Sequence, residues 1–168
     1  MKNINFLNKL KKQGKLDVVE SSEEIKESYL EKSESNLISA KILLKNERLE
    51  ESVSLVYYSM YNLLLALLFK TGIKSENHTA SIILFKEIFE KDNSFILFAK
   101  KERVDKQYYV DFKITKKEVE DLINKTELFN EELFDFISKL TNEKIKIYKD
   151  KFLWNFHYPF LKHGKPKK

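Results

Sequence analysis

The scarcity of glycine and proline limits the folds open to this chain more than any other feature of its sequence. Its 168 residues include only three glycines and two prolines, and both prolines fall within the last ten residues. A β-sandwich or barrel needs many tight turns, which glycine and proline form most easily. The sequence therefore predicts an all-α protein, and a chain of this length suits a single domain with one core.

Composition places the chain among ordered globular proteins. Hydrophobic residues make up 42% of it and charged residues 34%, which is typical of a domain that buries a core. The most apolar stretch, residues 55–69, contains Ser59 and Asn62 and is shorter than the roughly 18–20 residues of a membrane span. We therefore expect a core helix there and no membrane partner.

Cysteine usage and the first residues bear on the cellular compartment. The chain has no cysteine, which excludes disulfides and thiolate metal sites. Residues 1–6 hold no apolar run of the length that a signal peptide needs. Together these observations favour a cytoplasmic location.

Helical periodicity and start signals predict where the helices lie. Ser21 and Glu24 have the spacing of a capping box, which satisfies two free amides at a helix N-terminus. Asn46 and Glu47 suit a tight turn, and Gly72 suits a C-terminal cap. Helices are expected at residues 4–13, 21–45, 49–71 and 79–91, whereas residues 95–109 are expected to form a loop with one short helical stretch.

The last long helix has the clearest pattern. Thr115 and Glu118 repeat the capping-box spacing. A mostly apolar seam then follows in alternating steps of three and four residues, which favours left-handed bundle packing. We expect this helix to continue to Tyr148 or beyond. The seam consists of Val119, Leu122, Thr126, Phe129, Leu133, Phe136 and Leu140.

These segments predict an antiparallel up-and-down bundle of four main helices. The bundle is expected over residues 21–149, after a short N-terminal helix and linker at residues 1–20 and before an aromatic, basic C-terminal tail at residues 150–168. Its predicted core consists of Leu37, Ala40, Leu44, Val56, Met60, Leu64, Leu67, Phe85, Leu122, Phe129, Leu133 and Phe136.

The charge balance is mildly basic. Lysine and arginine total 31 against 26 acidic residues, a formal net charge of +5. Such an excess is compatible with a nucleic-acid partner, because neutralising phosphates supplies non-specific affinity. It is equally compatible with a solvated lysine surface, so charge alone does not decide between them.

The usual catalytic signatures are missing from the sequence. It has no phosphate-cradling glycine loop, no Gly-x-Ser-x-Gly, no His-Glu-x-x-His and no cysteine nucleophile. His78, His157 and His163 do not have metal-ligand spacing, so we expect no metal and no cofactor. His78 precedes a predicted helix whose free amides would attract an anion. The alternative is that it only caps or packs locally.

Three tyrosines lie on the predicted central helix. Tyr57 and Tyr61 are four residues apart and share a face, while Tyr58 lies about 100° around the helix. One interpretation is packing at the edge of the core with each hydroxyl hydrogen-bonded. The other is a groove in which these hydroxyls contact a nucleotide or a second subunit.

Several segments, in this order along the chain, resemble the HEPN domain family. Residues 55–62 are similar to the family's Ala-Tyr-Tyr-Ala-Met-Phe-His-like core helix. Residues 74–78 resemble its Lys-Thr-His segment, which opens a helix ending in Leu-Phe, here Leu84 and Phe85. Arg103 and Tyr108 resemble its Arg-x-x-Ala-Asp-Tyr stretch. The resemblance covers about residues 22–140.

The resemblance implies a helical bundle that commonly forms a homodimer. Many family members are encoded beside a minimal nucleotidyltransferase in toxin–antitoxin pairs, and others cleave RNA or bind nucleotides. The ribonuclease members use an arginine followed four to six residues later by histidine, paired across a dimer. Neither Arg48 nor Arg103 has a histidine at that spacing, so this chain departs from the pattern that the mechanism requires.

The resemblance without that motif implies a non-catalytic module that binds RNA or a nucleotide and pairs with a nucleotidyltransferase. The alternative is a ribonuclease whose site is assembled from Arg103, His78 and tyrosines such as Tyr108, with the histidine as general acid or base. The candidate binding residues are Tyr57, Tyr58, Tyr61, His78, Lys100, Lys101, Arg103 and Tyr108.

The C-terminal tail carries five aromatic residues at alternating positions. In an extended chain they would share one side, whereas in a helix Phe152, Phe156 and Phe160 would line up. Three interpretations remain open: a tail folded back on its own bundle, an anchor on a partner, or a stacking platform for single-stranded RNA. The candidate interface residues are Phe152, Trp154, Phe156, Tyr158 and Phe160.

Overall fold

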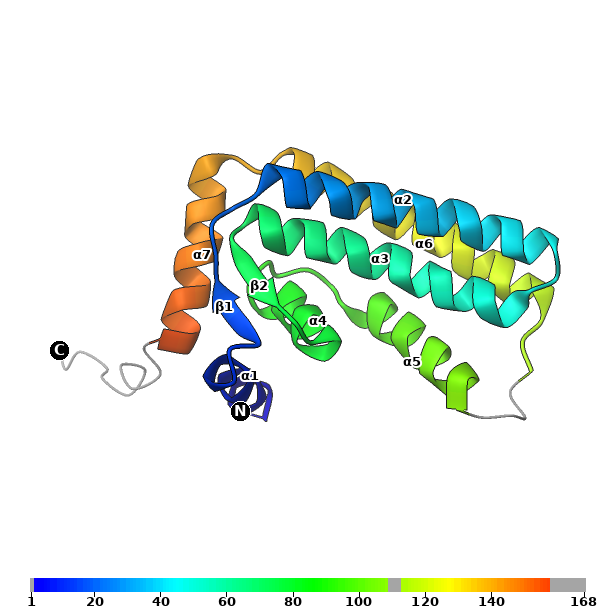
Figure 1. Cartoon of the computed structure of the whole chain (residues 1–168), viewed down its shortest axis with the longest axis horizontal. Coiled ribbons are helices and arrows are strands. Elements are labelled where there is room, and N and C mark those ends of the chain that lie inside the picture. The colour runs from blue at the N-terminus through cyan, green and yellow to red at the C-terminus, as the bar shows by residue number, and fades with distance from the viewer. Residues whose placement is uncertain (1, 109–112, 158–168) are drawn as a thin grey trace.

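Helices account for most of the computed structural model, which describes residues 2–108 and 113–157 (Figure 1). Two short strands, β1 (Leu16–Val18) and β2 (Ile73–Ser75), form an antiparallel pair. The helices are α1 (Lys2–Lys12), α2 (Glu23–Lys45), α3 (Leu49–Lys70), α4 (His78–Glu87), α5 (Ser94–Tyr108), α6 (Lys116–Ser138) and α7 (Asn142–His157).

The long helices alternate in direction, as the predicted up-and-down bundle requires. α2 and α3 form an antiparallel hairpin, and α6 packs along both of them (Figure 1). α4 and α5 lie on the other side of α3, while α7 crosses the end of the bundle near α1 and β1. The all-α bundle predicted from the sequence is confirmed, with one short strand pair that the sequence analysis did not anticipate.

α3 is the central element of the core. By length and composition it could cross a membrane, but 72% of its most apolar 18-residue window is buried inside the protein. Its predicted core residues Val56, Met60, Leu64 and Leu67 are all fully buried. Of the other predicted core residues, Ala40, Phe85, Leu122 and Leu133 are buried, and Leu37, Leu44, Phe129 and Phe136 are partly buried against them.

Serine side chains let α2 and α3 approach closely. The Ser33 hydroxyl donates to the Ser59 carbonyl oxygen at 2.8 Å, and the Ser59 hydroxyl donates to the Ser33 carbonyl oxygen at 2.8 Å. On α6, the Asn130 amide nitrogen donates to the Ser59 hydroxyl oxygen at 2.8 Å. These buried and partly buried hydrogen bonds join the three longest helices at one level of the bundle.

The strand pair fixes the corner between α3 and α4. Leu16 pairs with Ser75 and Val18 with Ile73. Gly72, just before β2, has φ +70°, and a Cβ there would lie 2.6 Å from the Val19 carbonyl oxygen. This position therefore requires glycine both for its left-handed backbone and for the close approach of the chain.

Several helix predictions from the sequence were wrong. The helix expected to reach residue 91, α4, ends at Glu87. The cap of α2 is Ser22, whose side chain accepts from the Ile25 amide, so Ser21 and Glu24 do not form a capping box. Residues 94–108 form the continuous helix α5 instead of a loop. α6 ends at Ser138, and the Thr141 hydroxyl accepts from the Lys144 amide at the start of α7. The capping box of Thr115 and Glu118 is present as predicted.

α7 changes the interpretation of the C-terminal aromatic residues. It runs through residue 150, where the tail was expected to begin. Phe152 is fully buried and Phe156 nearly so, with ring centroids 4.9 Å apart. These two rings pack within their own chain and are not available as partner anchors. Trp154 is 51% exposed, whereas Tyr158 and Phe160 lie outside the described residues.

Replacing Leu64 by alanine tests the central position of α3. We expect the free energy of unfolding to fall by about 2–5 kcal/mol, because the substitution leaves a cavity in the core. Urea denaturation followed by circular dichroism measures this loss. Ile38→Ala on α2, where the side chain is 52% exposed, should change it by less than about 0.5 kcal/mol. Equal losses in the two variants would contradict the core assignment.

Candidate functional site

The first residue of α4, His78, lies against the tyrosines of α3. The Tyr57 hydroxyl and His78 Nδ1 are 2.7 Å apart, within hydrogen-bonding distance. The His78 ring stacks on Tyr61 with centroids 3.9 Å apart and an angle of 12° between the planes. Tyr57 and Tyr61 are also stacked, with centroids 5.9 Å apart. The pair of tyrosines that shares a helix face therefore holds one imidazole.

Local hydrogen bonds determine where His78 enters the helix. Asn77 has an extended backbone and its side-chain oxygen accepts from the Ala80 amide, so it is the N-cap of α4. The Ser81 hydroxyl donates to the Asn77 carbonyl oxygen and contacts the Ser75 hydroxyl at the end of β2. Because both ends of this turn are hydrogen-bonded, the imidazole is directed onto α3.

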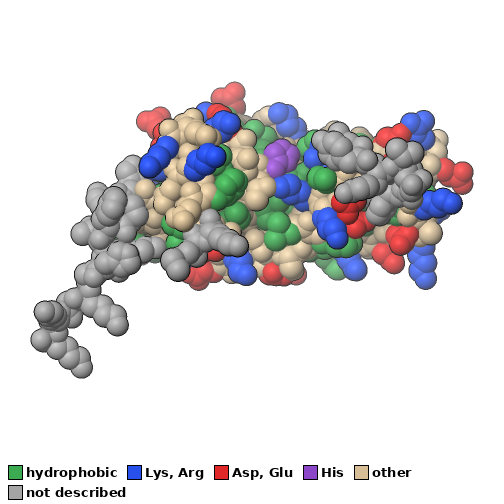
Figure 2. All heavy atoms as spheres, turned by 90° about the horizontal axis from the view of Figure 1, so that it is seen from below, with side chains coloured by type: hydrophobic (Ala, Val, Ile, Leu, Met, Phe, Trp, Pro, Cys, Tyr) green, Lys and Arg blue, Asp and Glu red, His purple; other side chains and the backbone are tan. Residues whose placement is uncertain are grey.

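Two cations from α5 complete the cluster. The Arg103 guanidinium carbon lies 4.8 Å from the centroid of the Tyr58 ring and 5.7 Å from that of Tyr57, a cation–π geometry. The Lys100 ammonium hydrogen-bonds to the Thr79 hydroxyl, one residue after His78. Figure 2 shows a histidine side chain at the surface of the molecule, close to lysine or arginine side chains.

The electrostatics of the cluster keep His78 neutral near neutral pH. Burial lowers the pKa of its imidazole, and the positive charges of Arg103 and Lys100 lower it further. Burial raises the pKa of the Tyr57 hydroxyl far above its usual range, so the phenol keeps its proton. Because a phenol is the better donor, we infer that Tyr57 donates to Nδ1 and that the ring proton is on Nε2.

This arrangement is suited to binding an anion. It offers a guanidinium, an ammonium and an imidazole N–H, all of which are hydrogen-bond donors. A phosphate group would supply acceptor oxygens and a negative charge to these donors.

The other predicted binding residues are placed differently. Lys101, beside Lys100 on α5, is exposed to solvent. Tyr108 is the last residue of α5, and its side chain lies outside what the structure describes. Tyr57 and Tyr61 are buried within their own chain. Tyr58 is only partly buried and is the tyrosine of the three that remains most accessible to a ligand or subunit.

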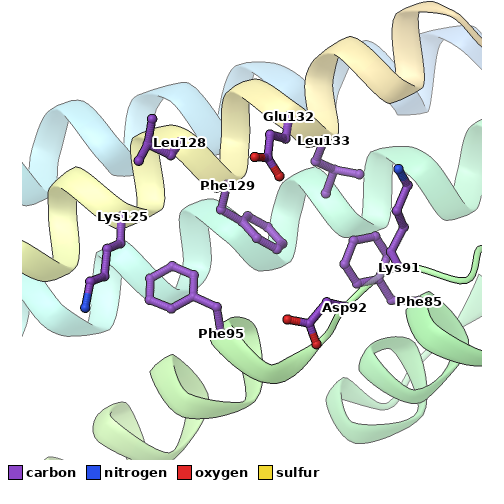
Figure 3. Close-up of a pocket in the computed structure, with 9 residues that line it drawn as sticks. All are labelled: Phe85, Lys91, Asp92, Phe95, Lys125, Leu128, Phe129, Glu132 and Leu133. Carbon is purple, nitrogen blue, oxygen red and sulfur yellow. The ribbon is translucent and has the colours of Figure 1, made fainter.

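A separate cavity lies between α6 and the segment joining α4 to α5. It has a volume of about 270 Å³, and the rings of Phe95 and Phe129 lie next to each other in its lining, with centroids 6.2 Å apart (Figure 3). Its charged lining residues have both signs, Lys91 and Lys125 with Asp92 and Glu132. The cavity includes none of the residues predicted for binding.

Metal binding is not supported by the described part of the chain. Within residues 2–108 and 113–157, no three histidine, aspartate or glutamate side chains gather in a way that could hold a metal ion. His157 ends α7 and its side chain is not described, and His163 lies beyond the described residues.

Fold and site together define a class of protein: a helical bundle with a histidine at the start of a short helix, packed on tyrosines of the central helix. The sequence model of the HEPN domain matches residues 26–146, which is most of the chain. The chain belongs to the HEPN domain family.

Relatives with known names cover parts of the chain. A UPF0332 protein of Thermotoga maritima is 35% identical over 69 residues, 41% of this chain and 52% of the relative. A UPF0332 protein of Pyrococcus horikoshii is 40% identical over 59 residues, 35% of this chain and 42% of the relative. The chain thus spans about half the length, or less, of these two relatives.

A third relative is matched over a longer stretch. The Methanocaldococcus jannaschii protein named "Putative toxin MJ0142" is 30% identical over 110 residues, which is 61% of this chain and 75% of that protein. By its name, this relative is described as a "Putative toxin".

Two residues that support the site, Asn77 and Thr79, were not predicted from the sequence. Asn77 is a preferred N-cap residue directly before an apolar helical pattern, and this signal would have started α4 one residue earlier than predicted. Thr79 carries no comparable signal, because its contact with Lys100 joins residues 21 positions apart. The approach of Arg103 to Tyr58 likewise depends on how α5 packs on α3.

Removing the charge of Arg103 tests the electrostatic coupling within the cluster. In Arg103→Gln the pKa of His78 should rise, because one of the positive charges that lower it is gone. NMR titration of the imidazole carbon-bound proton, assigned with His78→Asn, measures the shift. Lys101→Gln removes an exposed neighbouring charge and should change the pKa much less. Equal shifts in both variants would mean that Arg103 has no specific coupling to His78.

Proposed function

We propose that the protein is a HEPN-type binding module that holds RNA, or a nucleotide, by a phosphate group at the His78 cluster. The observation that supports this most directly is the convergence of His78, Lys100 and Arg103, from two different helices, beside Tyr57 and Tyr58. Phosphate contacts of arginine, lysine and helix N-termini are the commonest source of affinity for nucleic acids.

The tyrosines would support this binding in two ways. Tyr57 and Tyr61 orient the imidazole, through a hydrogen bond and a stack respectively. Tyr58, which is partly exposed, offers a ring on which a base could stack, a contact that tolerates any sequence. The proposed ligand is therefore single-stranded RNA bound with little sequence preference.

The wider setting we propose is a toxin–antitoxin-like pair. The module would form a homodimer and act with a nucleotidyltransferase partner in the cytoplasm. Its family membership and the toxin named among its relatives support this setting. The chain lacks the arginine–histidine spacing of ribonuclease members, which favours binding over cleavage.

The number of titratable groups at the cluster also favours binding. Cleavage of RNA by its own 2′-hydroxyl needs a base for that hydroxyl and an acid for the leaving oxygen. Within the described residues, His78 is the group of the cluster whose ordinary pKa lies near neutrality. The described cluster of a single chain therefore supplies one proton-transfer group of this kind, whereas the cleavage reaction needs two.

RNA cleavage is the second candidate function, and one observation favours it. Arg103 and His78, which are 25 positions apart in sequence, lie against the same ring of Tyr57. They could act together, with His78 as general acid or base and Arg103 stabilising the charge on the phosphate. A second copy of the chain would then have to supply the missing proton-transfer group.

RNA binding should depend on Arg103 and on salt. Fluorescence anisotropy with a labelled single-stranded RNA should show affinity falling steeply with salt, because binding releases condensed counterions. Arg103→Ala should weaken binding and reduce the slope of log affinity against log salt by roughly 0.7, the value for one phosphate contact. Arg48→Ala is the matched control, since Arg48 is exposed and paired with Glu51 at the α2–α3 turn. Equal effects of the two substitutions would contradict a phosphate site at Arg103.

The purified protein should not cleave RNA faster than a buffer control, because no histidine follows Arg48 or Arg103 at the spacing of the ribonuclease members. Gel electrophoresis of an end-labelled RNA measures this. If cleavage occurs, and Arg103→Ala and His78→Ala each abolish it while the circular dichroism spectrum is unchanged, the binding-module proposal is wrong. The cluster would then be a ribonuclease site.

A further inference from the structure

A groove runs between α2 and α6, away from the His78 cluster. Its volume is about 490 Å³. The groove is defined by residues from three helices, with α3 contributing part of its floor. The lining residues are Glu27, Leu30, Glu31, Ser33, Glu34, Leu37, Leu63, Asn130, Glu131 and Phe134.

The floor of this α2–α6 groove is apolar. Leu63 is buried on α3, and Leu30 and Leu37 are partly buried on α2. Phe134 on α6 is 53% exposed, so a large ring stands open to solvent beside them. An apolar floor with an exposed aromatic ring is a typical anchor surface for a partner.

The rim of the groove is acidic. Glu27, Glu31 and Glu34 follow one another at helical spacing on α2, and Glu131 faces them from α6. All four are exposed, and none of the lining residues is basic. Glu27 is paired with Lys26 at 2.7 Å. On a chain of net charge +5, this groove is a local region of negative potential.

One lining residue has an unused acceptor. The Asn130 amide nitrogen is bonded to Ser59. Its side-chain oxygen is buried and has no hydrogen-bond partner among the described residues. A buried acceptor without a donor is unfavourable, because it has lost its hydrogen bond to water. A donor that reached the floor of the groove would relieve this.

We propose that the α2–α6 groove docks a basic amphipathic helix of a protein partner. Apolar side chains of that helix would cover the floor, lysines or arginines would face the glutamate rim, and one polar donor would reach Asn130. A groove between two helices accepts a third helix by the usual ridge and groove packing. The acidic rim is complementary in charge to such a helix.

The same charges argue against other occupants. RNA would bring its phosphates against four glutamates. In a two-fold contact between copies of this chain the same patch would face itself, which sets like charges against each other. The groove is lined mainly from α2 and α6, whereas His78, Lys100 and Arg103 belong to α4 and α5, which lie on the other side of α3 from α2 (Figure 1). A docked helix would therefore leave the proposed phosphate site open, and this inference does not depend on that site.

A model peptide tests the charge and shape of the groove. The probe is a synthetic amphipathic helix of leucine and lysine, and isothermal titration calorimetry with the full chain should give micromolar binding that weakens with salt. The control peptide has the same pattern with glutamate in place of lysine and should not bind. Failure of the lysine peptide to bind, or equal binding of the two peptides, would overturn the proposal.

Paired variants locate the binding. Glu31→Lys combined with Glu34→Lys should weaken binding of the lysine peptide about tenfold or more, a change of about 1.4 kcal/mol. Glu47→Lys combined with Glu87→Lys makes the same charge change at exposed positions outside the groove and should have little effect. Phe134→Ala should weaken binding, whereas Leu128→Ala, at a position on α6 that is 62% exposed and outside the groove, should not.

Two results would show a different site or occupant. Equal weakening by the two pairs of charge variants would place the peptide elsewhere. Analytical ultracentrifugation without peptide gives the second test. If the unmodified chain is a dimer and the Glu31→Lys, Glu34→Lys variant is a monomer, a second copy occupies the groove and the proposal is wrong.

Discussion

The reciprocal hydrogen bonds between Ser33 and Ser59 are the contact on which the bundle depends. Two serines occupy positions where larger side chains would hold the helices apart, and each hydroxyl donates to the carbonyl oxygen of the other. Since these carbonyls already belong to helices, the bonds add an interaction without breaking the helical ladder. Each net contribution is about 1 kcal/mol, but together they set the register of α2 against α3. Asn130 extends that register to α6.

The sequence predicts the parts of the fold that depend on local signals. Three such signals involve only residues close together in the sequence. They are the apolar stretch of α3, the glycine with positive φ just after that helix (Gly72) and the capping box that begins at Thr115. α5 was missed because the buried side chains among its residues 94–105, Ile96 and Ala99, are few and give weak periodicity. The break between α6 and α7 was missed because it contains neither glycine nor proline and is marked only by a threonine cap.

The candidate site was predictable as a set of residues but not as an arrangement. Tyr57, His78 and Arg103 carry chemistry that can be read from the sequence. Their meeting depends on the strand pair, which brings residues 16–18 against residues 73–75 and so fixes the turn before His78. No local pattern predicts this pairing, since each strand has only three residues and they are separated by the whole of α2 and α3.

α3 presents two different faces to its neighbours, because side chains two residues apart on a helix point in nearly opposite directions. Tyr57 and Tyr61 point toward α4, whereas Ser59, two residues from each, lies about 200° around the helix and faces α2 and α6. One helix thus supplies the support of the His78 cluster on one side and the close helix contact beside the acidic groove on the other. Because the two faces share a backbone but no side chains, substitutions in the groove can change partner binding without moving the imidazole. This separation lets the two proposed activities be tested independently in one chain.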